Sequence, residues 1–360
     1  MHRVPTVDAP EEECMAARTL PSRLPIVQAP MAGGPSTPDL TAAVTRAGGF
    51  GFLAAGYLSP DQLLSAVADT REHTPLPFGV NIFCPTPPAD PAVVAAYAEL
   101  IRPESDRVGV PLGVPHWDDD AFGDKLAIVA TREVSTVSFT FGCPGTSTVE
   151  DLHAAGCTVA VTITSPDEAR VAADAGADLL IVQGTEAGGH QGSFLDHAPN
   201  QRPLTALVEE VRSSTAVPLV GSGGIMTGVR LAEVLAAGAV AAQLGTAFLC
   251  CPEAGTSPTY RRAILERPYR DTMLTRAFSG RWARGLANEF AVRYSGEAPE
   301  AYPEIHHLTR PLRTAATRAG DASTPNLWAG DGWRAATEDP AEVVVRRVAA
   351  ELEAATGTIA

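Results

Sequence analysis

The chain alternates between short, wholly apolar runs and longer stretches whose apolar positions recur with a helical period. One unit recurs: a helical stretch that ends in Ala-Gly, followed at once by a short apolar run. It occurs as RAGGFGFLAAG (46–56), AAGCTVAVT (154–162), DAGADLLIVQG (174–184) and AAGAVAAQLGT (236–246). Glycine in the left-handed conformation just past a helix end commonly stops a helix before a strand. Repetition of this unit is typical of strands and helices that alternate around a parallel sheet.

Eight apolar runs have the length and composition of strands buried on both faces. They lie near residues 25, 49, 77, 137, 157, 178, 217 and 240. Helical stretches separate most of them, and several open with Ser or Thr followed by Pro and acidic residues, which is helix N-cap chemistry. Eight such units in about 230 residues favour an α/β (β/α)8 TIM-type barrel over an open, doubly wound sheet.

This pattern divides the chain into four parts. Residues 1–24 lack an apolar signal segment and are expected to form an N-terminal tail, whereas residues 25–250 form the barrel. Residues 84–125, a Pro-rich loop, a helix and an acidic turn, are inserted after the third strand. Residues 251–325 are rich in Arg and aromatic residues and show no strand periodicity, so they predict a small helical lid over the barrel mouth. Residues 326–360 predict a loop and an amphipathic helix that packs back on the barrel.

The composition excludes several classes of protein. A formal net charge of −15 disfavours nucleic acid as a partner, because phosphate backbones need a basic surface. No apolar run approaches the ~20 residues of a membrane span, so we expect a cytoplasmic monomer or homodimer. The six cysteines contain no CxxC pair, which favours reduced thiols over disulfides or a metal site. Lys125 is the only lysine, and its surroundings fit neither a GxxxxGK phosphate loop nor a Schiff-base lysine.

Glycine-rich turns follow the seventh and eighth predicted strands, as GSGGIMTG (221–228) and GTAF (245–248). Active sites of such barrels lie at the carboxyl ends of the strands, and phosphate often binds after these two. Backbone N–H groups of Gly223, Gly224 and Gly245, with the Thr246 hydroxyl, would cradle an anion there. Two tight turns without a ligand are the alternative interpretation.

Amide side chains lie on other strands, with Asn81 on the third, Gln183 at the end of the sixth and Gln28 on the first. Amides can donate to and accept from a flat heteroaromatic ring, so together with the phosphate cradle they indicate FMN as the cofactor. His190 follows the sixth strand behind two glycines, in GTEAGGHQGSF. It belongs either to the floor of an active site or to a tight turn.

Seven motifs together resemble the nitronate monooxygenase family, formerly called 2-nitropropane dioxygenases, over most of residues 25–330. They are QAPMAGGPSTPDL, AGGFGFLAAGYLSP, PFGVNIF, GTEAGGHQGSF, GSGGIMTG, QLGTAFL and SGRWARGLANEF. The resemblance implies an FMN-dependent barrel enzyme that oxidises alkyl nitronates, such as propionate 3-nitronate, with molecular oxygen. The products would be a carbonyl compound plus nitrite or nitrate.

The resemblance also implies roles for single residues. The family's catalytic histidine corresponds to His190, which would hold the nitronate oxygens or remove the α-proton of a neutral nitroalkane. The implied FMN contacts are Met31 (through the backbone around it), Asn81, Gln183, Gly188, Gly224, Gln243, Leu244, Gly245 and Thr246. The flavin would carry the electron chemistry, and the protein would supply orientation and a dry site.

Two positions depart from the family pattern. Gln191 stands where many relatives carry arginine, which removes a cationic neighbour for a substrate carboxylate. Asp331 replaces glutamine in NLWAGDGW and would repel an anionic substrate unless it points away. The other histidines of these regions, His197, His306 and His307, are expected to be solvated or to serve packing.

Three alternatives remain at this point. An FMN-dependent enoyl-acyl-carrier-protein reductase, using NAD(P)H, shares the barrel and the EAGGH motif, although SGRWARGLANEF and the long lid favour the nitronate enzyme. A dehydrogenase of the inosine monophosphate type needs a nucleophilic cysteine, for which Cys143 in FGCPGT is the one candidate. A non-catalytic flavin-binding protein would not need an imidazole at position 190.

Overall fold

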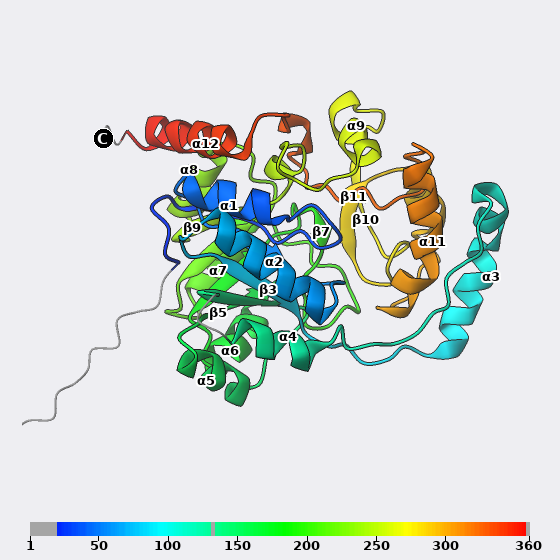
Figure 1. Cartoon of the computed structure of the whole chain (residues 1–360), viewed down its shortest axis with the longest axis horizontal. Helices are drawn as coiled ribbons and strands as arrows, with labels where there is room; N and C mark the ends of the chain where they lie inside the picture. The colour runs from blue at the N-terminus through cyan, green and yellow to red at the C-terminus, as the bar shows by residue number, and fades with distance from the viewer. Residues whose placement is uncertain (1–19, 131–133, 358–360) are drawn as a thin grey trace, which may run out of the picture.

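The computed structural model of the chain describes residues 20–130 and 134–357, so residues 1–19 of the predicted tail lie outside the described part. Eight parallel strands form one sheet in the order β1-β9-β8-β6-β5-β4-β3-β2 (Figure 1). A parallel bridge between Val27 and Phe50 joins the two ends, so the sheet closes into the predicted barrel. The strands are β1 (Ile26–Gln28), β2 (Phe52–Ala54), β3 (Gly79–Phe83), β4 (Thr136–Thr140), β5 (Thr158–Ile163), β6 (Leu179–Gln183), β8 (Leu219–Ser222) and β9 (Ala241–Leu244).

Seven helices follow barrel strands along the chain. They are α1 (Pro38–Arg46), α2 (Pro60–His73), α4 (Phe122–Val129), α5 (Thr146–Ala154), α6 (Pro166–Asp174), α7 (Leu204–Arg212) and α8 (Gly228–Ala236). The predicted caps are present: the side chains of Thr37, Ser59 and Ser165 each accept a backbone N–H from the first turn of α1, α2 and α6. Helices α4 and α7 were not identified from the sequence.

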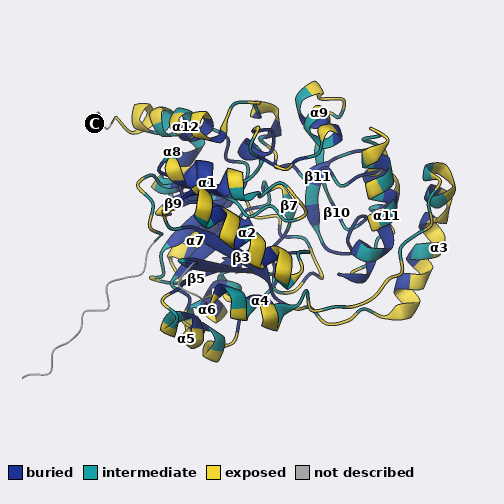
Figure 2. Cartoon of the chain, viewed as in Figure 1, coloured by how far each residue is buried: buried dark blue, intermediate teal, exposed yellow. Residues whose placement is uncertain are grey.

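The apolar side chains of the barrel strands form two layers of the core, one inside the barrel and one between the strands and the helices. Figure 2 shows these strands as buried. Alternate residues such as Phe52, Ile181 and Val220 point inward and pack together inside the barrel. Their neighbours, such as Leu180 and Leu244, pack outward against the helices. Because both faces are covered, the strands read as continuous apolar runs, which is why they could be recognised in the sequence.

Residues 251–325 contain the expected helices and, in addition, two strands that the sequence analysis did not predict. The elements are α9 (Pro258–Glu266), β10 (Thr272–Thr275), β11 (Ala283–Leu286), α10 (Glu289–Tyr294) and α11 (Glu304–Arg318), and the short helix η1 (Thr246–Phe248) precedes this region. Strands β10 and β11 form an antiparallel sheet with β7 (Gly189–His190), a two-residue strand that follows β6. The expectation that this region has no strand is therefore wrong.

The helix of the insertion after the third strand packs against this lid, whereas the acidic turn of the insertion contacts the barrel, where Asp120 accepts the Tyr57 N–H at 3.0 Å. Helix α3 (Pro91–Val108) lies beside α11 in Figure 1, and the two helices share an apolar core with Phe278 and Phe290. The Tyr97 hydroxyl donates a hydrogen bond of 2.8 Å to the carbonyl of Ala277. Insertion and lid therefore form one unit over the barrel mouth.

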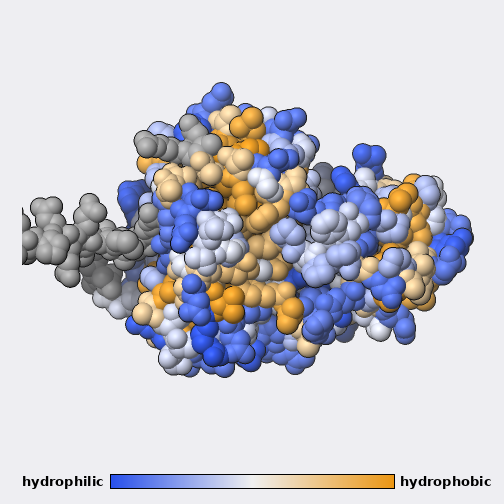
Figure 3. Space-filling model, turned by 90° about the horizontal axis from the view of Figure 1, so that it is seen from below, coloured by the Kyte–Doolittle hydropathy of each residue, from blue (hydrophilic) through white to orange (hydrophobic). Residues whose placement is uncertain are grey.

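The C-terminal helix α12 (Ala341–Thr356) follows η2 (Trp333–Ala335) and packs against α8 and α1 of the barrel. No helix in the described residues is long and apolar enough to span a membrane. In the view of Figure 3, apolar residues gather over the barrel part of the molecule and are bordered by polar ones. The exposed large apolar side chains are spread over several elements, such as Leu64 on α2 and Val171 on α6, and single ones are ordinary on a protein surface.

Candidate functional site

A cavity of about 570 Å³ lies at the carboxyl ends of the barrel strands, beneath the lid. It has the size of a small-molecule or cofactor site. It brings together His190 and nine of the ten residues expected to contact the cofactor: Met31, Asn81, Gln183, Gly188, Gly223, Gly224, Gln243, Gly245 and Thr246. Leu244, the tenth, does not line the cavity, because its side chain points outward into the core between sheet and helices.

His190 is positioned by its pairing with the lid sheet. In strand β7, His190 lies opposite Ala283 of β11, and the next residue, Gln191, donates its backbone N–H to the carbonyl of Trp282. The Gln183 amide holds the loop from the barrel side, donating to the His190 carbonyl (2.9 Å) and accepting from the Gly192 N–H (2.7 Å). The segment SGRWARGL thus serves as the pairing partner of the histidine loop.

Each of the two glycines before His190 is required for a different structural reason. Gly189 adopts φ of +80°, which favours glycine, and a Cβ at Gly188 would collide with the backbone of Gly330. This close approach lets the histidine loop pack directly on the loop of residues 326–333. The sequence left open whether His190 belongs to a tight turn or to an active-site floor. The segment of residues 188–190 is both a tight turn and part of the cavity wall.

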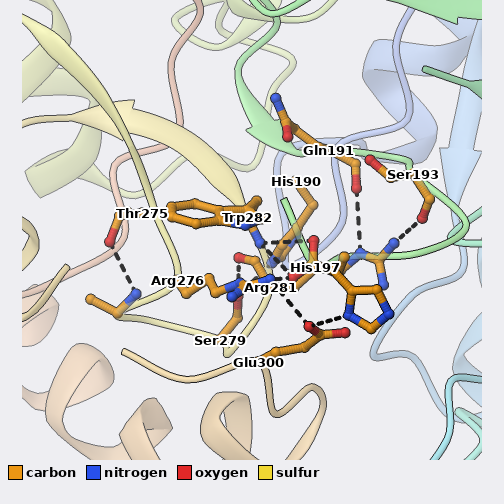
Figure 4. Close-up of polar contacts among 12 residues, drawn as sticks. His190, Gln191, Ser193, His197, Thr275, Arg276, Ser279, Arg281, Trp282 and Glu300 are labelled. Atoms are coloured by element: carbon orange, nitrogen blue, oxygen red, sulfur yellow. Dashed lines mark hydrogen bonds and ion pairs between the residues drawn. The ribbon is translucent and has the colours of Figure 1, made fainter. Parts of the chain in front are cut away.

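The imidazole of His190 lies in an aromatic enclosure. Its Nε2 is 2.7 Å from the Ser279 hydroxyl oxygen, the contact drawn in Figure 4. The rings of Phe141, Tyr302 and Trp328 surround it at centroid distances of 5.6, 5.8 and 5.3 Å. The ring keeps some accessible surface because it borders the cavity, but it lies deep within the protein. Burial, followed by the charges of the nearby arginines, lowers the pKa of His190 from 6.5 to about 3, so the imidazole is neutral at pH 7.

The glycine turns after β8 and β9 form the other end of the cavity. Gly223 and Gly224 have φ of +143° and +65°, and in the described part of the chain the N–H groups of Gly224 and Thr246 have no protein acceptor. The Thr246 hydroxyl accepts the Gly330 N–H at 3.0 Å, which leaves its own hydrogen available to donate. These groups can satisfy an anion.

The amide side chains differ in how far the protein uses them. The Gln243 Oε1 atom is buried and has no hydrogen-bond partner among the described residues, and its side chain borders the cavity. A buried amide oxygen without a partner is costly unless a ligand or water donates to it. The Asn81 Nδ2 atom is held by Ser138 and Thr140.

Gln28 does not belong to the site, contrary to the expectation from its position on the first strand. Its Oε1 accepts the Phe52 N–H at 3.0 Å, and its Nε2 donates to Ser36 at 2.9 Å. It is absent from the cavity wall. The amide therefore joins β1 to β2 in the interior of the protein.

Helix α11 contributes a cationic wall that sequence analysis missed. Arg310, Arg313 and Arg318 line the cavity, together with His306, and none of the described lining residues is Asp or Glu. His306, expected to be solvated or to serve packing, stacks on Tyr57 at 4.1 Å and also borders the cavity. The spacing of residues 306, 310, 313 and 317 indicates that they share one face of a helix. The sequence does not show that this face, rather than another, meets the barrel.

The two departures from the family pattern both point away from the cavity. Asp331 is held outside it by Arg284 (3.0 Å) and by the Thr272 hydroxyl (2.6 Å). The Gln191 side chain forms a reciprocal pair of 2.8 Å hydrogen bonds with the backbone of Asn200. Neither residue therefore places a charge beside a ligand in the cavity.

The remaining candidate residues serve the structure. His197 pairs with Glu300 at the surface (2.9 Å), and His307 pairs with Asp118 (2.8 Å). Lys125 is fully buried and forms an ion pair with Asp120 at 2.7 Å. Cys143 lies outside the cavity wall, and burial raises the pKa of its thiol to about 11, which disfavours a nucleophilic thiolate.

Comparisons with known proteins agree with this geometry. The family model "Nitronate monooxygenase" matches residues 19–351. A probable nitronate monooxygenase of Bacillus subtilis (strain 168) is 36% identical over 323 residues, covering 88% of this chain and 92% of that protein. The crystal structure of nitroalkane oxidase from Streptomyces ansochromogenes is similar with a TM-score of 0.91 and 46% identity, over 94% of this chain and 98% of that chain. FabK from Thermotoga maritima is similar with a TM-score of 0.74 and 27% identity, over 94% and 95% of the two chains. The chain therefore belongs to the nitronate monooxygenase family of flavin-dependent oxidoreductases.

Proposed function

We propose that the protein binds FMN in this cavity and oxidises alkyl nitronates, such as propionate 3-nitronate, with molecular oxygen. The products are a carbonyl compound plus nitrite or nitrate. The observation that carries this proposal is a neutral, enclosed imidazole, His190, beside a cavity that has arginines and no carboxylate among its described lining residues. Such a site favours an anionic organic substrate over a cationic one.

The residues present fit FMN. The free N–H groups of Gly224 and Thr246 would hold the single phosphate of FMN. The unpartnered Oε1 of Gln243 would accept a hydrogen bond from the flavin ring, beside the backbone around Met31. When bound, the flavin supplies the electron-accepting chemistry.

His190 would orient the substrate rather than carry charge. With the single Ser279 hydroxyl hydrogen donated to Nε2 at 2.7 Å rather than to the more distant Arg281 carbonyl at 3.3 Å, the imidazole proton lies on Nδ1, where it can donate to a nitronate oxygen. The rings of Phe141, Tyr302 and Trp328 exclude water from this contact and so strengthen it.

The pKa of His190 favours a nitronate over its neutral nitroalkane. A base with a pKa of about 3 has little driving force to remove a carbon-bound proton at neutral pH. Neutral nitroalkanes remain a second candidate substrate, because the similar Streptomyces protein is described as a nitroalkane oxidase. His190 would then act as the base, and turnover would be slow compared with that of the preformed nitronate.

Anaerobic mixing of the purified, FMN-loaded protein tests the proposal. Propionate 3-nitronate should bleach the flavin absorbance, and admission of oxygen should restore it. Reduced nicotinamide cofactor, mixed in a separate experiment, should leave the flavin oxidised. Bleaching by NAD(P)H and not by the nitronate would instead indicate the enoyl-acyl-carrier-protein reductase activity, and bleaching by neither would indicate a non-catalytic flavin protein.

A further inference from the structure

The charge inside the cavity is opposite to the charge of the chain. The chain carries a formal net charge of −15, yet three arginines and no acidic residue are found among the described residues that line the cavity. All three arginines, Arg310, Arg313 and Arg318, come from helix α11. Arg310 and Arg318 are exposed to solvent at the mouth, whereas Arg313 lies inside.

Arg313 has hydrogen-bond partners but no counter-ion. Its Nε donates to the Thr309 hydroxyl (3.0 Å), Nη1 to Asn326 Oδ1 (2.7 Å) and Nη2 to the His306 carbonyl (3.0 Å). All of these acceptors are uncharged, and in the described part of the chain no carboxylate pairs with the guanidinium. Arg276 by contrast pairs with Asp196 at 3.0 Å. Arg281 resembles Arg313 in having only uncharged acceptors among the described residues, the carbonyls of Gln191 and Ser193, but it does not line the cavity.

The positive charge of Arg313 persists at neutral pH. Burial lowers the pKa of the guanidinium to about 10, with Tyr57 opposing and Arg310 reinforcing the change, so the group stays protonated. The surface that it retains borders the cavity. A buried charge that lacks a partner is costly, and an anion in the cavity would remove that cost.

We propose that Arg313 is the residue that selects a negatively charged substrate, because among the described lining residues it is the one cation inside the cavity rather than at its mouth. The inference rests on the proposed function, since it names the charge and the binding residue of the substrate at the same site. Position 191 could not supply this charge, because its side chain is an uncharged amide that points away from the cavity.

The cofactor phosphate is the other anion that Arg313 could serve, and the geometry favours the substrate. Arg313 contacts His306, which stacks on Tyr57, and its charge contributes to the lowered pKa of His190. The phosphate cradle is formed by other segments, the turns after β8 and β9. Arg313 is therefore electrostatically coupled to the histidine.

Two probes of matched shape isolate the charge: propionate and its neutral analogue propionamide. Binding of each to the FMN-loaded protein is measured by titration calorimetry. Arg313→Gln should raise the Kd of propionate about 10- to 100-fold while the Kd of propionamide changes less than about 3-fold. For the nitronate, KM should rise similarly and kcat should change little. Arg313→Lys should restore part of the preference, because it keeps the charge but loses the guanidinium fork.

Arg262→Gln is the matched control, because Arg262 is an exposed lid arginine whose Nη2 contacts the Gly320 carbonyl outside the cavity wall. It should change neither Kd. Equal affinity of the unmodified protein for propionate and propionamide would overturn the inference, and this measurement does not depend on whether any variant folds. An Arg313→Gln protein that loses FMN but keeps the ratio of the two affinities would also overturn it. A protein that prefers propionate through Arg313 yet oxidises no nitronate would contradict the proposed function alone.

Discussion

The side chain of His190 is constrained by three neighbours that act in different ways. Ser279 fixes its Nε2, the Gln183 amide holds its carbonyl, and burial among aromatic rings keeps it neutral. In the proposed function, Arg313 therefore supplies the positive charge for the substrate, and His190 supplies a directed hydrogen bond to it. A histidine that titrated near pH 6.5 would have combined the two roles.

Replacing His190 by asparagine should leave the fold and the flavin spectrum intact while lowering the rate. Loss of one positioned hydrogen-bond donor typically costs about 10²–10³-fold in rate, and loss of a positioned acid-base group about 10²–10⁴-fold. A neutral nitroalkane, which needs a proton removed, should lose more than a preformed nitronate. Steady-state rates per bound flavin, with nitroethane and its nitronate, measure both effects.

His197→Asn is the control for this experiment, since His197 lies seven residues further on and is paired with Glu300 at the surface. It should have the rates of the unmodified protein. If His190→Asn turned over both substrates at the normal rate per flavin, His190 would be a structural residue of the loop and the catalytic assignment would be wrong.

Among strands and loops, the sequence predicted those whose pattern is local. The eight barrel strands are apolar on both faces, and their glycine turns recur at fixed places, so both were recognisable. Strands β10 and β11 were not, because segments such as ARGL (283–286) are short and mixed. They become strands only by pairing with each other and, for β11, with β7. The distant contact between Gly188 and Gly330 is likewise invisible in a linear pattern.

The same reasoning explains which parts of the site were found. The glycine cradle and His190 lie next to strongly patterned strands, and nine of the ten expected cofactor residues line the cavity. Leu244 was predicted as a cofactor contact together with Gln243 and Gly245. Alternate residues of a strand face opposite sides, so Leu244 faces the helices instead. Arg313 was missed because its role depends on how helix α11 docks across the barrel, which is a tertiary property.

Changes in the two glycine turns should weaken retention of the flavin in a graded way. Thr246→Ala removes one hydroxyl donor. Gly224→Asp strains a residue with φ of +65°, brings a Cβ within 3.0 Å of the Glu186 Cβ and adds a negative charge to the turn whose N–H would hold the phosphate. We expect FMN, not FAD, to be released on denaturation, and less of it to be retained after dialysis in the order unmodified protein, Thr246→Ala, Gly224→Asp. Flavin absorbance per protein measures this.

Gly296→Asp provides the control, because a Cβ at this exposed glycine would meet no atom within 4 Å. It should retain FMN normally. Full retention by Gly224→Asp would contradict the placement of the phosphate in this turn.

Across the entire fold, the active cavity depends on segments that are far apart in the chain. The barrel supplies the glycine cradle, the insertion buttresses α11 through α3, and α11 supplies the arginines. The lid sheet joins these parts, because β11 pairs with the histidine loop. The consequence is that two histidines, His190 and His306, are enclosed as neutral groups where the lid meets the barrel, and burial lowers the pKa of both.

This enclosure predicts how stability depends on pH. The pKa of His190 is about 3 in the folded protein and near 6.5 when unfolded, so below pH 6.5 the unfolded chain binds a proton that the folded chain does not. The free energy of unfolding should therefore decrease as the pH falls from 6.5 toward 3, by roughly 1.4 kcal/mol per pH unit at most for this one group. Asp120 and Asp196, whose pKa values burial raises, act in the opposite direction. The contribution of His190 must accordingly be measured as a difference between proteins.

Urea unfolding of the unmodified protein and of His190→Asn, at equal flavin content and between pH 7 and pH 5, isolates that difference. At pH 7 the variant should be less stable by about 1 kcal/mol, because it loses the hydrogen bond to Ser279. As the pH falls, the gap should close or reverse, because asparagine does not titrate while His190 increasingly favours the unfolded state. The carboxylates contribute equally to both proteins and cancel. Stability curves that stay parallel over this range would show that His190 is not held neutral, and would remove the argument that a preformed nitronate is the preferred substrate.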